Sequence, residues 1–190
     1  MLLFVNCCVR DCSRTKRLAD RLLSGLDGEV KEIRLSEVSF PVADEAFLKH
    51  RDSLIMSGSY DDPLFAMARD FAAADTIVIA APYWDLSFPA ALKQYIEQIN
   101  VIGLTFGYTA EGERIGLCRA AKLYYVTTAG GMIESDEYGF GYFRTLAQGF
   151  YGIPCAVQIK AEGLDLYGAD EEAILLSAEA EIDRLFSENE

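Results

Sequence analysis

The chain has 190 residues, of which 51% are hydrophobic and 25% charged, a composition typical of a globular domain rather than of a disordered chain. Thirty acidic residues against 17 basic ones give a formal net charge of −13, which would repel both a nucleic-acid backbone and an anionic membrane surface. We therefore expect one domain over 1–190 that binds no nucleic acid and no membrane. A small phosphate ligand is compatible with this charge, because a few local donors suffice to bind it.

The start of the chain and its cysteines bear on the compartment. The apolar run that opens the sequence is too short for a signal peptide, and no stretch reaches the length of a transmembrane helix. The cysteines are odd in number and scattered, which favours a reducing environment. They are Cys7, Cys8, Cys12, Cys118 and Cys155. We expect a cytoplasmic protein.

The first third of the chain predicts a strand, a helix and a second strand. Residues 2–7 form an apolar run typical of a buried strand, and leucines recur at helical spacing from Ser13 onward. Residues 29–35 alternate in polarity, as a second strand would. The segment 36–62 is irregular, with one helical piece at 44–56.

The remainder continues the same alternation. Pro63 favours the start of a helix that runs to about Ala74, because proline suits the first helical position. Residues 76–81 are apolar and β-branched, as in a central parallel strand that is buried on both faces. The further predicted elements are a helix at 88–99, a hairpin at 104–115 that turns at Glu111-Gly112, a strand at 121–128, a helix at 138–151, a strand at 154–161 and a helix at 170–186.

This order of elements predicts an α/β fold with a doubly wound, five-stranded parallel sheet and helices on both faces. Ligands of such sheets bind beyond the carboxyl ends of the strands. The loops after the first, third and fourth predicted strands, at 8–15, 82–88 and 128–136, are therefore the first candidates for a site.

The first of these loops combines features that suit a phosphate group. It precedes a helix, whose N-terminus presents free N–H groups and a positive dipole end. Ser13 and Thr15 add hydroxyl groups, and Arg10 or Arg14 can add positive charge. The alternative is that Ser13 only caps the helix and that both arginines are solvated.

The other two loops suit a flat ring. Tyr83 and Trp84, the latter the single tryptophan, stand where the third strand ends, where aromatic neighbours could stack on a heteroaromatic ligand. Gly130 and Gly131 allow backbone to approach a ligand closely. Packing under the next helix and an ordinary turn are the alternatives. Taken together, the three loops predict a mononucleotide-like ligand.

Three segments resemble the family of FMN-dependent NADH-azoreductases and NAD(P)H quinone reductases. Residues 76–99, TIVIAAPYWDLSFPAALKQYIEQI, are similar to its third strand, flavin loop and following helix. Residues 103–109 resemble its G-x-T-F-x-Y stretch, and 127–131 resemble its T-S-R-G-G loop. The resemblance implies a flavodoxin-like fold of three α/β/α layers. It also implies a homodimer in which NADH or NADPH reduces bound FMN, which in turn reduces a quinone, an azo compound or a similar small-molecule acceptor.

The resemblance also assigns residues. Ser13, Arg14 and Thr15 match the family's phosphate-binding S-x-S, and Cys8 falls near a serine that touches the phosphate. With Arg10 and Pro82 added from the loop analysis, the expected cofactor-binding residues are Cys8, Arg10, Ser13, Arg14, Thr15, Pro82, Tyr83, Trp84, Asp85, Leu86, Thr128, Ala129, Gly130 and Gly131. No side chain is expected to carry the redox chemistry, which belongs to the flavin, and no metal site is expected.

Two positions depart from the family pattern. Asp85 stands where asparagine is usual, and a carboxylate beside the ring would disfavour an anionic reduced flavin and lower its potential. Ala129 replaces a common arginine, so one side-chain contact is lost. These differences affect the expected potential and acceptor more than the choice of cofactor.

Two other functions are compatible with parts of the sequence. Cys8 to Thr15 spells C-x5-R-[ST], the phosphate loop of tyrosine phosphatases, in which Cys8 would attack phosphorus and Arg14 would clamp the phosphoryl oxygens. The loop lacks the glycine-asparagine pair of the low-molecular-weight class. A non-catalytic flavodoxin-like electron carrier is the other alternative, although the insertion at 36–62 and the hairpin at 104–115 exceed what a small carrier needs.

Overall fold

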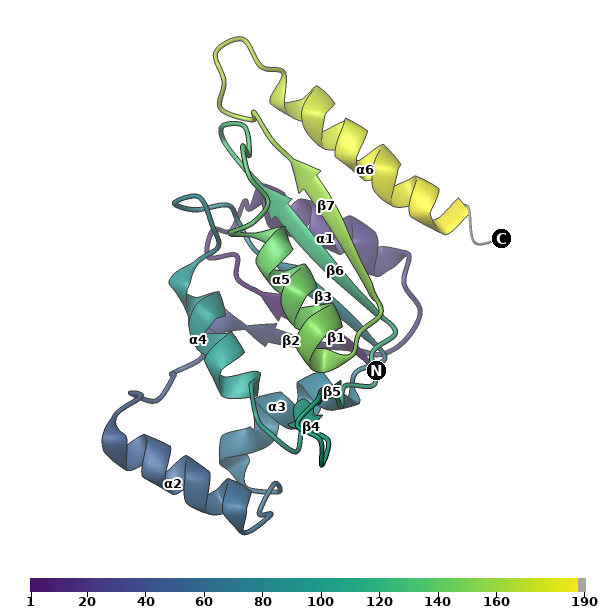
Figure 1. Ribbon diagram of the computed structural model, residues 1–190. Coiled ribbons are helices and arrows are strands. Elements are labelled where there is room, and N and C mark those ends of the chain that lie inside the picture. Colours follow the sequence, from purple (N-terminus) through teal and green to yellow (C-terminus); the bar gives the residue numbers. More distant parts are fainter. Residues whose placement is uncertain (188–190) are drawn as a thin grey trace.

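The sheet has five parallel strands in the order β2-β1-β3-β6-β7 in the computed structural model, which describes residues 1–187 (Figure 1). The strands are β1 (Leu2–Asn6), β2 (Val30–Arg34), β3 (Thr76–Ala80), β6 (Lys122–Thr128) and β7 (Cys155–Ala161). Each neighbouring pair is parallel. This confirms the expected flavodoxin-like order, in which the chain reverses its direction of winding beside β1.

Helices cover both faces of this sheet. They are α1 (Arg14–Ser24), α3 (Ala66–Ala73), α4 (Ala90–Ile99), α5 (Phe140–Leu146) and α6 (Glu171–Ser187), whereas α2 (Glu45–Met56) lies away from the sheet. The helices α1 and α6 pack on one face, and α3, α4 and α5 pack on the other. Every helix within residues 1–187 is too short or too polar to span a lipid bilayer.

The predicted elements are confirmed with small differences at their ends. The helix expected from Pro63 begins as a short 3₁₀ turn at Pro63–Phe65, and the one expected over 138–151 ends in a wide π-helical turn at Ala147–Tyr151. The alternation expected for β2 is only partly realised, because β2 is an edge strand of which only Ile33 is half-buried. The predicted hairpin consists of β4 (Phe106–Tyr108) and β5 (Arg114–Gly116).

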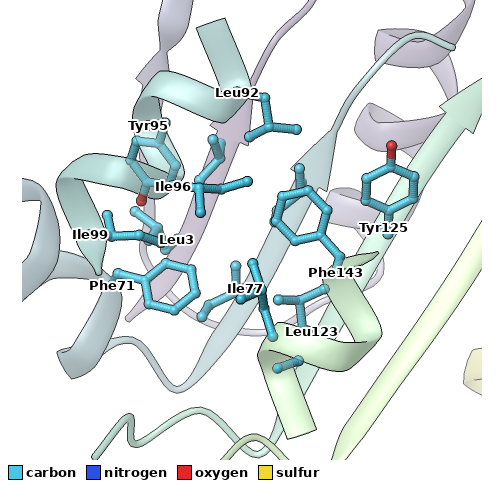
Figure 2. Packing of buried hydrophobic residues seen from close by; sticks show 14 of the residues in the cluster. Leu3, Phe71, Ile77, Leu92, Tyr95, Ile96, Ile99, Leu123, Tyr125 and Phe143 are labelled. Carbon is cyan, nitrogen blue, oxygen red and sulfur yellow. The ribbon is translucent and has the colours of Figure 1, made fainter. Parts of the chain in front are cut away.

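The two faces of the sheet bury different side chains. The face under α3, α4 and α5 is rich in aromatic rings, among them Phe71, Tyr125 and Phe143, which pack with leucine and isoleucine (Figure 2). The face under α1 and α6 is mainly aliphatic. Both layers hold the sheet rigidly, which fixes the ends of its strands and the loops that follow them.

The segment 36–62 forms an arm at the side of the molecule. Its helix α2 projects away from the sheet and buries none of its residues fully (Figure 1). A small separate cluster around Phe65, Ala68 and Val101 anchors the arm. The side chains of Val42 and Met56 remain 79% and 89% exposed.

Candidate functional site

A cavity of about 240 Å³ lies at the carboxyl end of the sheet, where the loops after β1, β3, β6 and β7 meet. Its lining residues are Val9, Arg10, Cys12, Ser13, Arg14, Thr15, Pro82, Tyr83, Trp84, Thr128, Gly130 and Asp165. Nine of these are residues expected from the sequence. The three loops singled out by their position after parallel strands therefore do form one site.

The N-terminus of α1 forms the polar end of the cavity. Ser13 is the N-cap of the helix, and its hydroxyl oxygen accepts a hydrogen bond from the Lys16 N–H at 3.2 Å. The capping interpretation is thus confirmed, although Ser13 also lines the cavity. One bond satisfies only one of the N–H groups that open a helix, so Arg14 and Thr15 retain backbone donors for an anion.

Two buried threonines join the first loop to the loop after β6. The hydroxyl oxygens of Thr15 and Thr128 lie 2.6 Å apart, and both side chains are almost completely buried. Each hydroxyl can donate only one proton, so this hydrogen bond occupies the donor of one of the two. Thr15 therefore links two walls of the cavity, a role that its place in the sequence did not reveal.

Arg14 is held by acidic side chains. Its guanidinium donates to both carboxylate oxygens of Asp165, at 2.7 and 3.3 Å, and to Glu171 at 3.3 Å. The hydrogen bonds from Arg14 hold the pKa of Asp165 below its usual value. Arg14 thus reaches the cavity with its charge partly compensated. Arg10 lines the same cavity and is exposed.

Asp165 is the main functional residue that the sequence did not indicate. It lies in the loop after β7, which carries no motif, and its N–H donates to the Gly130 carbonyl at 2.9 Å. A Cβ atom on Gly130 would lie 2.2 Å from the Asp165 carboxylate, so a larger residue there would displace this side chain. Only its place after the predicted strand at 154–161, at the same edge of the sheet, could have indicated this loop from the sequence. Val9 and Cys12 also line the cavity without having been expected.

The loop after β3 supplies the aromatic wall. The Tyr83 N–H donates to the Thr128 carbonyl at 3.0 Å, which continues the pairing of β3 with β6 and places Tyr83 beside the threonine pair. Trp84 is 40% exposed, so one part of its ring is available to a ligand. Both rings line the cavity, and Tyr83 is half-buried whereas Trp84 is exposed.

Five expected residues lie outside the cavity lining. Asp85 and Leu86 line an adjacent groove, Ala129 is buried and donates its N–H to the Ala161 carbonyl at 2.9 Å, and Gly131 is exposed beside the cavity. Cys8 lies beneath the first loop, half-buried, and its N–H donates to the Asn6 side chain at 2.8 Å.

The position of Cys8 contradicts the phosphatase alternative. A nucleophilic cysteine must be a thiolate near neutral pH, which requires a lowered pKa and access to the substrate. Burial instead raises the pKa of the Cys8 thiol, and Cys8 is absent from the lining of the cavity. The loop holds phosphate-binding groups without an activated nucleophile.

The residues of the cavity fit the two ends of a flavin mononucleotide. Hydroxyl groups, two arginines and the start of a helix line the cavity together with the rings of Tyr83 and Trp84. Polar groups suit a phosphate, and aromatic side chains suit a ring system. Within residues 1–187, no group of three or more histidine, cysteine or acidic side chains could hold a metal ion.

Comparisons with known proteins agree with this geometry. A family model described as "Flavodoxin-like fold" matches residues 1–186. An FMN-dependent NADH:quinone oxidoreductase of Clostridium beijerinckii is 34% identical over 173 residues, which cover 87% of this chain and 86% of that protein. FMN-dependent NADH:quinone oxidoreductase 2 of Clostridium acetobutylicum is 47% identical over 120 residues, 60% of this chain but only 59% of that protein.

Solved structures show the same fold. An azoreductase from Bacillus anthracis superposes with a TM-score of 0.83 at 21% identity, over 98% of both chains. An FMN-dependent NADH-azoreductase from the same species, solved in complex with FMN, superposes with a TM-score of 0.81 at 21% identity, over 98% of this chain and 97% of that one.

Proposed function

The chain belongs to the family with the flavodoxin-like fold, and we propose that it is an FMN-dependent NAD(P)H oxidoreductase. It would transfer two electrons from NADH or NADPH to quinones, azo compounds or similar acceptors. The whole chain would form a single FMN-binding domain. The observation that carries the proposal is one cavity lined both by groups that suit a phosphate and by aromatic rings. The printed names of the relatives, which mention FMN, NADH and quinone, support it.

Each wall of the cavity has a role in this proposal. The start of α1 with Ser13, Arg14 and Arg10 would hold the phosphate, and Thr15 would keep Thr128 in place through their hydrogen bond. The loop from Pro82 to Leu86 would lie along the isoalloxazine, and the loop from Thr128 to Gly131 would lie at the polar edge of the ring. Cys8 would support the phosphate loop from below. When bound, FMN supplies the electron transfer itself, while the protein places and tunes it.

We further propose a cytoplasmic homodimer. The cysteines of the chain are all free, which supports a reducing compartment. Exposed apolar side chains on the arm, among them Val42 and Met56, support contact with a second copy. Light scattering during gel filtration tests the dimer, since a monomeric mass would remove it and favour an electron carrier.

The test of the function uses the single tryptophan. FMN is titrated into the apoprotein while Trp84 fluorescence is followed, and the absorbance of the bound flavin is then recorded as NADH or NADPH is added without air. We expect quenching, then bleaching by the nucleotide, then recovery of the colour when a quinone is added. Trp84→Phe is the control variant, since it keeps an aromatic ring at this position and removes the fluorescence signal of tryptophan.

The outcomes distinguish an oxidoreductase from an electron carrier. Binding without bleaching by either nucleotide would point to an electron carrier. Failure to bind FMN at all would contradict both the cavity assignment and the proposed enzyme.

A further inference from the structure

A groove beside the cavity carries features that the cofactor site does not use. We propose that it binds the electron acceptor and selects neutral or cationic aromatic acceptors over anionic ones. This inference rests on the proposed function and adds to it the class of acceptor.

The groove and the cavity share one loop. Pro82, Tyr83 and Trp84 line the cavity, and the next four residues of the same loop line the groove. The groove has a volume of about 580 Å³, and its lining residues are Asp85, Leu86, Ser87, Phe88, Lys93, Glu137, Tyr138 and Tyr142. This volume falls within the usual range for sites of small organic ligands. A ligand in the groove would therefore lie across the loop from whatever occupies the aromatic end of the cavity.

A strained turn separates the two hollows. Trp84 and Ser87 exchange backbone hydrogen bonds at 3.0 and 2.8 Å, and the two residues between them, Asp85 and Leu86, have φ angles of 51° and 67°. Left-handed backbone is costly for a residue such as leucine, and strain of this kind is concentrated at functional sites. The turn leaves the Leu86 side chain 64% exposed at the edge of the groove.

The walls of the groove are apolar and aromatic. Phe88 and Tyr142 have ring centroids 5.7 Å apart, and the exposed Tyr138 stands opposite the turn, where its carbonyl accepts a hydrogen bond from the Ser87 hydroxyl. This bond ties the loop after β3 to the loop before α5, so the groove has two connected walls. Such walls suit a flat aromatic ring.

The lining of the groove is more acidic than basic. Its acidic side chains are Asp85 and Glu137, and neither forms an ion pair with another side chain in residues 1–187. Its one basic side chain, Lys93, is paired with Glu97 at 2.6 Å. In the cavity, Arg14 is paired with Asp165 and Glu171, whereas Arg10 forms no ion pair in residues 1–187. An anionic acceptor would thus be repelled where an anionic phosphate is attracted.

The proposed reaction transfers two electrons and two protons to the acceptor. NADH, one proton and a quinone give NAD⁺ and the hydroquinone, so two electrons and two protons reach the acceptor. The acceptor gains no net charge in this reaction. The carboxylates therefore act on the charge that the acceptor carries when it binds.

The experiment compares two acceptors, 1,4-naphthoquinone and 1,4-naphthoquinone-2-sulfonate, with the FMN-loaded protein. The ratio of their kcat/KM values is measured for the native protein, for Glu137→Gln and for Asp85→Asn/Glu137→Gln. The two quinones differ in intrinsic reactivity, but this difference is the same for every variant, and a change in flavin potential affects the reduction of both quinones. A change in the ratio therefore reports the charge of the groove. Asp27→Asn, an exposed acid at the far end of α1, is the control for net charge.

We expect the preference for the neutral quinone to fall roughly threefold in Glu137→Gln and about tenfold in the double variant at low salt. It should remain unchanged in Asp27→Asn. In equilibrium dialysis against the oxidised FMN-loaded protein, Glu137→Gln should bind the sulfonate more tightly and the neutral quinone as before.

An unchanged ratio, with both quinones reduced, would overturn the inference and leave the proposed function intact. If the native protein reduces neither quinone, the proposed function fails, while dialysis still reports on the groove. A change of oligomeric mass in the groove variants would identify the groove as a subunit interface and overturn its assignment to the acceptor.

Discussion

The two faces of the sheet are held by different forces. The face under α3, α4 and α5 is closed by aromatic rings in direct contact, as in the packing of Phe71 against Tyr151 with centroids 4.9 Å apart. The face under α1 and α6 has a thinner aliphatic layer, and a row of ion pairs runs along its outer edge. The cavity at the carboxyl end of the sheet includes the start of α1, which belongs to this second face.

The row of ion pairs follows the helical repeat of α1. Arg14, Arg17 and Arg21 lie three and four residues apart and face the acidic side of α6. Arg17 pairs with Glu172 and Glu179, and Arg21 pairs with Asp183. Arg14 stands at both the end of this row and the wall of the cavity. A ligand phosphate would therefore share this arginine with the contact between two helices.

The largest effect is expected on the aromatic face. Phe143 is fully buried and contacts Phe88 and Tyr125 with ring centroids 5.4 and 5.3 Å away. Phe143→Ala should lower the free energy of unfolding by about 3–5 kcal/mol, because it leaves a cavity among rings. Urea unfolding followed by circular dichroism measures this loss. Phe143→Leu is the control and should cost much less, and equal losses would mean that the stability is lost with the ring contacts rather than through the cavity.

An intermediate effect is expected where the second face meets the cavity. Thr15→Val should lower the free energy of unfolding of the apoprotein by about 1–3 kcal/mol, because it leaves the buried Thr128 hydroxyl without its partner. Thr15→Ser retains the hydroxyl and serves as the control in the same urea titration. If valine proved as stable as serine at this position, the hydrogen bond would not contribute to joining the two loops.

The smallest effect is expected along the row of ion pairs. Arg21 holds the pKa of Asp183 below its usual value, so this pair stabilises the fold above about pH 4 and ceases to do so as acid protonates the carboxylate. Arg21→Ala should lower the thermal midpoint slightly at neutral pH, and the difference from the native protein should vanish in strong acid and shrink in high salt. Asp183→Asn should produce the same loss, and the double variant no more than either. A difference that persists in acid would show that Arg21 acts by packing instead.

Much of the fold follows from local patterns. The apolar residues of β3 and the leucines of α1 predict a buried strand and a helix with one apolar side, and both lie where expected. The Ser13 cap and the turn at Gly112, with φ of 84°, also follow from local backbone requirements. The function expected from the sequence agrees with the names of the curated relatives.

Other features depend on residues that are far apart in the chain. Asp165 reaches Arg14 across 151 residues, and no local pattern marks either as the partner of the other. The exposure of β2 depends on its place at the edge of the sheet, which its own alternation did not reveal. The groove requires the turn at Asp85 and Leu86 to stand beside Tyr138.

The sequence by itself determined the order of strands and helices, the parallel sheet and the three loops that meet at its carboxyl end. Hydrophobic periodicity and helix capping act over a few residues, so they can be read along the chain. The tertiary structure alone decided which charges meet in the cavity, that Cys8 is held beneath it, and that a groove lined by Asp85 and Glu137 lies beside it. Electrostatic and packing interactions depend on distance in space, and only the folded chain brings these groups together.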